Sequence, residues 1–169
     1  MNKPILFVFI FAVTFLLNVQ SSISQSLKDY RWTLIDAKGE DEVTGRHEDT
    51  FIAYKDKFYL MGGRGVNPVN VFDPATNSWE IKSKSPMEIH HFQAVLVGNA
   101  FYLMGAMTGK YPGETPLENI WIYYPEKDVW EKGPEIPVQF QRGGAGAVLF
   151  NNKIYQVGGI KLGHTSGTT

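Results

Sequence analysis

The sequence predicts an all-β fold made of repeated sheets, and three observations point to it. Residues 58–62 (FYLMG) recur unchanged at 101–105, and residues 154–159 (IYQVGG) form a looser third copy. The similarity extends outward, because residues 72–80 (FDPATNSWE) match residues 124–131 (YPEKDVWE). Helix signals are absent beyond the N-terminus. A repeat of about 40–55 residues makes the repeat, rather than the whole chain, the unit of folding.

The first repeat has the pattern of four short strands, expected at residues 50–54, 58–61, 69–72 and 79–82. Aromatic and β-branched residues dominate these segments, while Gly, Pro, Asn and Asp separate them. This spacing is typical of a four-stranded antiparallel meander. The pair at residues 62–63 is Gly-Gly, which suits a backbone that must take a positive φ or approach a neighbour closely.

The second repeat follows the same plan, whereas the third only begins it. Strands are expected at residues 94–97, 101–104, 120–123 and from 130 onward, then at 145–150 and 154–157. Residues 30–35 (YRWTLI) have the pattern of the fourth strand of a repeat, with Trp32 in the place of Trp79 and Trp130. No first three strands precede them.

These repeats resemble the kelch family. The resemblance rests on the Gly-Gly pairs at 62–63 and 158–159, from which Gly105 and Ala106 depart mildly, on the aromatic-Asp-Pro turn, and on the Trp that follows it. It covers roughly residues 30–169. It implies a β-propeller, in which four-stranded blades stand around a central channel. The chain would supply two complete blades, half a third, and an N-terminal closing strand. Kelch domains include enzymes and binding modules, so the fold alone does not give the function.

Too few blades are present to close a ring, which typically has about four to eight. We therefore expect the sequence to be the front part of a longer protein. A self-assembling partial propeller and a decayed or unstable product are the alternatives. In propellers of this kind an N-terminal strand completes the last blade and covers its edge. Uncovered blade surfaces would make the isolated chain prone to aggregation.

The N-terminus has the pattern of a secretory signal peptide. Lys3 precedes an apolar core from Ile5 to Leu17, and Ser22 and Ser24 supply small residues before a cut expected after Ser24. The core is shorter than the roughly 20 residues that a spanning helix needs. A secreted or periplasmic protein is expected, with an uncleaved anchor as the alternative.

The expected organisation follows from these boundaries. It comprises a signal peptide (1–24), an N-terminal strand with its linker (25–45), two complete repeats (46–89 and 90–141) and a truncated repeat (142–169).

Composition excludes several classes of function. Charged residues make up 20% of the chain with a formal net charge of −1, and no basic stripe is present, so nucleic-acid binding is not expected. No membrane association is expected after signal cleavage. The chain has no Cys, so the cysteine-linked tyrosine of kelch-type copper oxidases cannot form from these residues.

Candidate ligand-binding residues gather where the connections between strands four and one and between strands two and three meet. We call this side of the repeats the loop face. The candidates are Arg46, His47, His90, His91, Tyr111 and Arg142. Arg46 and Arg142 hold the same repeat position, and the resemblance implies that this arginine often points to the channel mouth. A guanidinium there suits a carboxylate. The alternative is that both arginines bridge neighbouring blades through backbone carbonyls and acidic side chains.

The sequence favours no metal or other cofactor. His90 and His91 invite a metal hypothesis, but adjacent residues of a strand face opposite sides unless the backbone turns there. No third ligand is evident, so one His is expected at the mouth and the other between blades. Tyr111 and Trp121 are candidates for stacking on a ligand, whereas Trp32, Trp79 and Trp130 are expected to pack the blades.

Two classes of function remain, besides a purely structural domain. The first is an exported module that binds a protein or glycan at the propeller mouth. The second is a carbohydrate-active enzyme resembling the secreted kelch-type sialic-acid mutarotases, in which Arg142 would hold the sugar carboxylate and Glu48 or His91 would move protons. No set of catalytic residues is visible in the sequence, so binding is favoured.

Overall fold

The computed structural model describes residues 31–39 and 42–164. The chain divides into two units, residues 1–34 and 35–169. The described part of the first unit, residues 31–34, has no regular secondary structure. The expected signal peptide at 1–24 lies outside the described residues. Across the described ranges, no helix combines the length and apolar character needed to cross a membrane.

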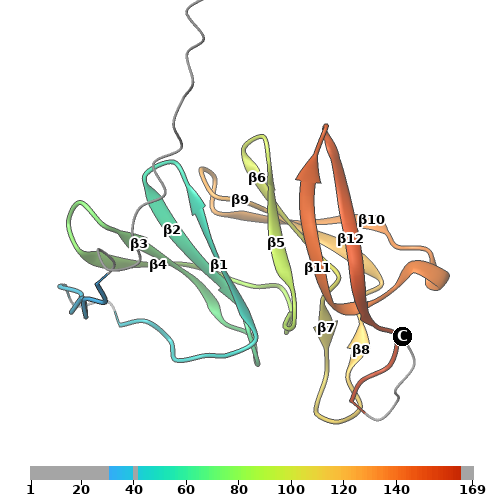
Figure 1. Cartoon of the computed structure of the whole chain (residues 1–169). Coiled ribbons are helices and arrows are strands. Elements are labelled where there is room, and N and C mark those ends of the chain that lie inside the picture. Colours follow the sequence, from blue (N-terminus) through green and yellow to red (C-terminus); the bar gives the residue numbers. More distant parts are fainter. Residues whose placement is uncertain (1–30, 40–41, 165–169) are drawn as a thin grey trace, which may run out of the picture. The chain divides into compact units, whose positions relative to one another are not determined.

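The first sheet contains four antiparallel strands in chain order (Figure 1). They are β1 (Asp49–Tyr54), β2 (Lys57–Gly62), β3 (Pro68–Asp73) and β4 (Ser78–Lys84). Tight turns join β1 to β2 and β3 to β4, and in them Lys55 (φ 52°) and Asn77 (φ 57°) take the left-handed conformation that short hairpin turns require. The turn residues therefore fix the register of the sheet.

The second sheet repeats this arrangement, with strand order β5-β6-β9-β10. Its strands are β5 (Gln93–Val97), β6 (Ala100–Met104), β9 (Asn119–Tyr124) and β10 (Val129–Glu135). A hairpin that was not predicted, β7 (Met107–Thr108) with β8 (Thr115–Pro116), interrupts the connection from β6 to β9. It projects at the lower edge of Figure 1.

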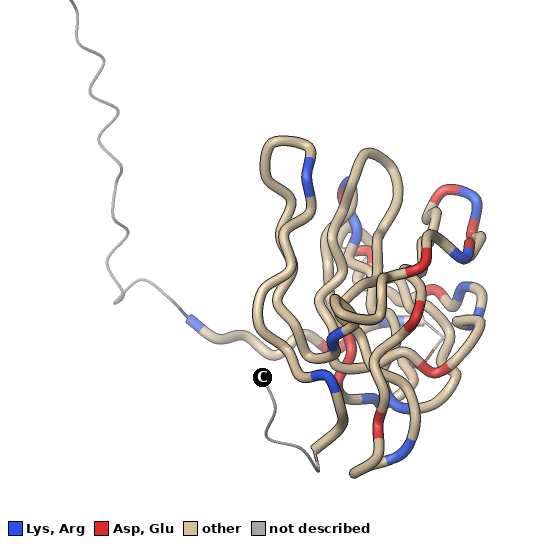
Figure 2. Tube along the Cα trace, turned by 90° about the vertical axis from the view of Figure 1, so that its right-hand side faces the viewer, with Lys and Arg blue, Asp and Glu red and all other residues tan. Residues whose placement is uncertain are grey.

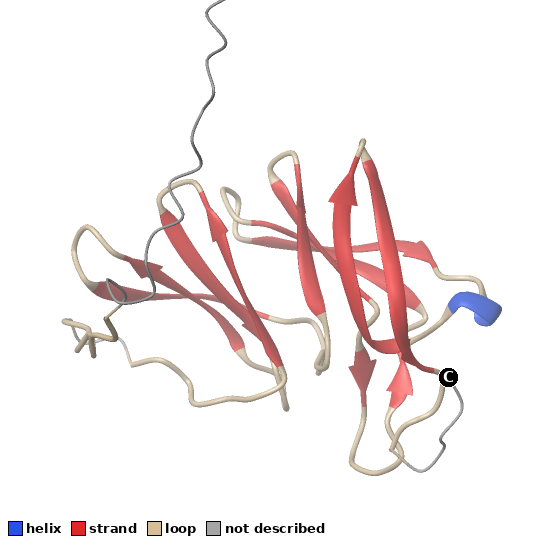
Figure 3. Ribbon diagram, viewed as in Figure 1, coloured by secondary structure: helices blue, strands red, loops and turns tan. Residues whose placement is uncertain are grey.

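The third repeat is a two-stranded hairpin of β11 (Gly143–Phe150) and β12 (Lys153–Ile160). The short 3₁₀ helix η2 (Val138–Phe140) precedes it and is the helix drawn in Figure 3. The first strands of the three repeats, β1, β5 and β11, lie side by side (Figure 1). The predicted all-β architecture of four-stranded antiparallel blades is confirmed.

The main core lies between the first two sheets, because alternate residues of their strands face each other. The first sheet contributes Met61 (β2) and Val71 (β3) to this core. The second sheet contributes Phe101 and Leu103 (β6), and all four side chains are buried. Tyr59 closes the contact with its ring 5.2 Å from that of Phe101. The packing of one blade on the next thus provides the burial that a single sheet lacks.

The repeated tryptophans differ in their surroundings. Trp130 packs against the core cluster with its ring 4.9 Å from that of Tyr123. Trp79 lies against Phe72 and Phe51, and Phe51 is itself exposed. Trp32 is fully exposed, and residues 31–37 form no strand, so the closing role of this segment stays a prediction.

We expect Trp130→Ala to destabilise the protein more than Trp79→Ala. A fully buried Trp costs about 3–5 kcal/mol when truncated to Ala, and the partly buried Trp130 should cost roughly half of that. Trp79 contacts the exposed ring of Phe51 and the half-buried ring of Phe72 and lies outside the core cluster, so it should cost less. Chemical denaturation of both variants checks the order, and equal losses would contradict it.

Candidate functional site

Three residues at equivalent repeat positions line up on the loop face. Glu48, His91 and Gly144 lie where β1, β5 and β11 begin, and all three have positive φ, at 63°, 52° and 67°. The His91 N–H donates to the Glu48 carbonyl at 2.8 Å, and the Gly144 N–H donates to the His91 carbonyl at 2.8 Å. This conformation is uncommon for Glu and His. Backbone strain of this kind concentrates at functional sites.

Arg64 is the centre of a charged network on this face. It follows the Gly62–Gly63 pair at the end of β2. Its Nε lies 2.6 Å from Glu48 Oε2, and its Nη2 lies 2.6 Å from Glu114 Oε1. Its Nη1 donates to the Gly109 carbonyl at 2.9 Å. Glu114, on the loop between β7 and β8, is fully buried, so the hairpin is tied to the first sheet by this ion pair.

The network keeps both carboxylates ionised. Burial opposes ionisation of Glu114, but hydrogen bonds from Arg64 and its own backbone N–H, with His164 nearby, lower its pKa to about 2. Burial also opposes ionisation of Glu48, but the close interaction with Arg64 and the charge of His91 lower its pKa overall. The pKa of Arg64 is raised, chiefly by its hydrogen bond to Glu114. Away from this network, acidic and basic positions are interspersed (Figure 2).

Because Glu114 is ionised in the folded protein, the fall in protein stability at acid pH measures the contribution of its ion pair with Arg64. Its pKa is lower in the folded protein than in the unfolded chain, so its contribution is complete above the unfolded value near 4.5 and is lost as the pH falls toward about 2. We expect Glu114→Gln to be less stable than the native protein at pH 7 and to lose less stability between pH 5 and pH 2.5. Denaturation midpoints at both pH values test this, and parallel pH profiles would contradict it.

His90 and His91 point toward each other, contrary to the expectation that their side chains face opposite ways. Their Nδ1 atoms are 2.7 Å apart, because His91 adopts a left-handed rather than an extended backbone. His90 Nε2 lies 3.1 Å from the Gly109 carbonyl, which can only accept, so Nε2 carries the proton. The Nδ1 of a neutral His90 then accepts from Nδ1–H of His91. Burial lowers the pKa of both imidazoles, consistent with neutral rings.

A carboxylate completes this group of side chains. Glu48 Oε2 lies 3.0 Å from His91 Nδ1 and 3.6 Å from His90 Nδ1. The ligand atoms of Glu48, His90 and His91 all lie within 4.8 Å of one another, so these three residues could hold a metal ion. The third ligand that the sequence did not reveal is therefore Glu48.

The two arginines of the shared repeat position hold backbone within their own sheets. Arg46 donates to the carbonyls of Pro68 at 2.8 Å and Gly62 at 3.3 Å. Arg142 donates to the Gly158 carbonyl, which is the matching position in the third unit, at 3.4 Å. These contacts support a carbonyl-binding role, although within one blade rather than between neighbouring blades.

The remaining predicted candidates lie around the network. His47 is exposed, and its Nδ1 is 3.3 Å from Glu48 Oε1. Tyr111 is 70% exposed, and its ring centroid is 5.2 Å from that of His164, which in turn is 5.3 Å from that of His91. Sequence reasoning missed His164 and the role of Arg64. The one available signal for Arg64 was its place directly after a Gly-Gly pair on the loop face.

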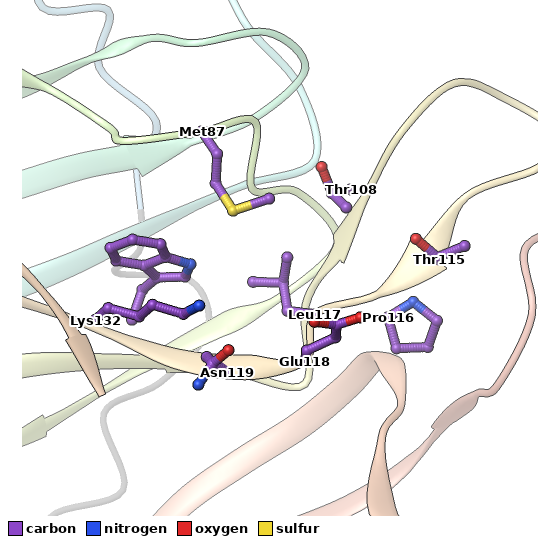
Figure 4. A pocket seen from close by; sticks show the side chains of 9 residues that line it. Met87, Thr108, Thr115, Pro116, Leu117, Glu118, Asn119 and Lys132 are labelled. Carbon is purple, nitrogen blue, oxygen red and sulfur yellow. The ribbon is translucent and has the colours of Figure 1, made fainter. Parts of the chain in front are cut away.

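A pocket of about 280 Å³ lies beside the β7–β8 hairpin (Figure 4). Trp121, a predicted stacking residue, forms part of its wall and also packs against the core cluster. The other lining residues are Met87, Thr108, Thr115, Pro116, Leu117, Glu118, Asn119 and Lys132. The pocket thus combines one large aromatic ring with hydrogen-bonding groups.

Four-stranded antiparallel blades packed side by side through their first strands define a β-propeller type of repeat protein. No protein-family model matches the chain. It is 32% identical over 98 residues to a kelch domain-containing protein of Sulfurisphaera tokodaii, covering 56% of this chain and 13% of that protein. It is 26% identical over 108 residues to Kelch-like protein 35 of Mus musculus, covering 61% and 17%.

A third match, to alpha-scruin of Limulus polyphemus, has 27% identity over 125 residues and covers 70% of this chain and 13% of that protein. The chain therefore spans less than a fifth of the length of these relatives. The solved structure of YjhT shares the fold with a TM-score of 0.61 at 18% identity, covering 70% of this chain and 35% of that one. These sequence similarities and the shared fold support a kelch-type β-propeller.

Proposed function

We propose that this chain is the binding part of an exported kelch-repeat protein and that it recognises a protein or glycan ligand on the loop face, at the propeller mouth. The main support is the left-handed backbone of Glu48 and His91, where two polar side chains occupy positions that favour Gly. The charged start and apolar core of residues 1–24 support export.

The loop face offers polar and aromatic groups rather than free positive charge. Arg64 is already engaged by two carboxylates and a carbonyl. Tyr111 is exposed beside the network, and Trp121 lines the neighbouring pocket with Lys132 and Asn119. A few placed polar groups around aromatic walls are typical of sites for small polar ligands. A glycan, with its hydroxyl groups and apolar ring faces, fits this combination.

A binding screen with matched variants tests the proposal. Purified protein would be passed over immobilised neutral and carboxylate-bearing glycans, and Kd would be measured for each hit. We expect Tyr111→Ala and Lys132→Met to weaken binding at least about tenfold, a loss of about 1.4 kcal/mol. Lys153→Met, in the tight turn between β11 and β12, serves as the control and should leave Kd unchanged.

The outcomes separate the ligand classes. Glycan binding that depends on Tyr111 or Lys132 supports a glycan ligand. Without glycan binding, proximity labelling in the producing cell should identify a protein partner whose capture depends on the same two residues. If neither kind of ligand depends on them, the proposed binding surface is wrong.

The pairing of His91 with Glu48 favours the enzyme as a second candidate. His91 Nδ1 lies 3.0 Å from Glu48 Oε2, which would orient the imidazole and leave its Nε2 to exchange a proton. A sugar carboxylate would then bind Arg142, whose guanidinium donates to the Gly158 carbonyl at 3.4 Å. Interconversion of the sialic-acid anomers, followed by NMR, would test this activity. Acceleration that is lost in His91→Gln and Arg142→Met would support the enzyme, and an unchanged spontaneous rate would exclude it.

A further inference from the structure

Three potential metal-binding atoms converge at the entrance to the first two blades. His90 Nδ1 and His91 Nδ1 are 2.7 Å apart, and Glu48 Oε2 lies 3.0 Å from His91 Nδ1 and 3.6 Å from His90 Nδ1. Bonds of about 2.0–2.2 Å to a shared tetrahedral ion would place ligand atoms roughly 3.3–3.5 Å apart. Movements of a few tenths of an ångström would bring this triangle to that geometry.

The outer contacts of His90 are those of a metal ligand. This side chain is fully buried, and its Nε2–H donates to the Gly109 carbonyl at 3.1 Å, with Glu88 Oε1 at 3.6 Å. A ligating His typically donates its second N–H to a carbonyl or carboxylate, which fixes the tautomer and leaves the first nitrogen for the metal. Here that first nitrogen is Nδ1, which faces His91 and Glu48.

Glu48 provides an independent observation in favour of a ligand. Its Oε2 is buried, and although Arg64 Nε and His91 Nδ1 lie close to it, neither has hydrogen-bond geometry toward it. A buried acceptor without a hydrogen bond is costly. An ion on the histidine side of the carboxylate would satisfy this oxygen, and Arg64 would keep its contacts with Glu114 and the Gly109 carbonyl.

The charge of the cluster also suits a cation. Glu48 and Glu114 contribute two negative charges, and Arg64 compensates only one of them. The Nδ1–Nδ1 contact of the histidines requires one nitrogen to accept, so the pair holds neutral rings. The net negative charge favours a divalent cation over an anionic ligand at this place.

We propose that Glu48, His90 and His91 form a binding site for a divalent transition metal, with Zn²⁺ as the reference ion. Two imidazole nitrogens and one carboxylate oxygen are ligands typical of Zn²⁺, and the same set with open positions also binds Fe²⁺. In the third unit the equivalent position is Gly144, which has no side chain and adds no protein ligand. The proposal does not depend on the ligand-binding function proposed above.

The backbone of this site allows an unusually clean test. His91→Gly and Glu48→Gly remove a ligand while supplying the residue that positive φ favours, so neither variant should destabilise the backbone. Protein without a polyhistidine tag would be stripped with EDTA, titrated with ZnCl2 by calorimetry at pH 7, and analysed for bound metal after dialysis. His47→Ala is the control, because this neighbouring His lies outside the group of three.

We expect one Zn²⁺ per native chain and a rise in Tm when Zn²⁺ is added. Each Gly variant should weaken binding at least about 100-fold, since loss of an outer contact alone costs about 10–100-fold. The metal-free Tm should not fall in His91→Gly, whereas in Glu48→Gly it should fall because Arg64 loses one of its two carboxylate partners. His47→Ala should bind Zn²⁺ as the native protein does. Absence of saturable binding, or binding that survives in both Gly variants, would overturn the proposal.

Discussion

Replacing Arg64 with Met should destabilise the protein by about 3–5 kcal/mol at pH 7, the usual effect of leaving a buried charge without its partner. Arg64 joins Glu48 to Glu114 with distances of 2.6 Å on each side. The side chain of Glu114 is completely buried, whereas that of Arg64 is 21% exposed, so water can replace the guanidinium only in part. The free energy of unfolding from chemical denaturation measures the effect.

Two further variants show whether the loss comes from the unpaired carboxylate. Adding Glu114→Gln to Arg64→Met should restore part of the stability, because the buried charge is then removed together with its partner. Arg142→Met is the matched control, since Arg142 contacts one carbonyl at 3.4 Å and should cost less than about 1 kcal/mol. Equal losses for Arg64→Met and Arg142→Met would contradict the proposed role of the network.

Gly62→Ala should also destabilise the protein strongly, by about 2–4 kcal/mol, because overpacking adds to backbone strain at this position. A Cβ on Gly62 would lie 2.5 Å from the Ile89 carbonyl oxygen and 2.5 Å from the Phe92 ring. The Ile89 carbonyl also accepts the Gly63 N–H at 2.8 Å, so it cannot move without breaking the contact between the sheets.

Gly158 separates the two causes of this loss. It has the same φ of +74° as Gly62, but a Cβ there would meet nothing within 4 Å. Gly158→Ala should therefore cost only about 1 kcal/mol of backbone strain. The difference between the two variants in chemical denaturation gives the steric contribution, and similar losses would show that close packing at Gly62 is unimportant.

The strands could be predicted from the sequence because their signals are local. Alternating apolar residues and short polar turns located each strand of the first two blades, and the repeat confirmed the assignment. The β7–β8 hairpin was missed, since each of its strands has two residues and no alternation can be recognised over so short a length.

The candidate site was only partly predictable, because its contacts join distant residues. Placing Glu48, His90 and His91 on the loop face required only chain direction. That the two imidazoles meet depends on the left-handed backbone of His91, which neither His nor its neighbours indicate. The only hint was Gly144, the glycine at the equivalent position of the third unit. Arg64 and Glu114 belong to different blades, and no local pattern pairs them.

The shared left-handed position has a consequence for how such a protein diversifies. Each repeat presents a single residue there that is paired with no residue of the neighbouring strand, so a substitution changes the chemistry of the loop face without altering the register of the sheet. Glu48, His91 and Gly144 are three different choices at one site. If the loop face binds a ligand as proposed, its specificity can change by one substitution per repeat, and Gly144 is a position where a side chain would be new.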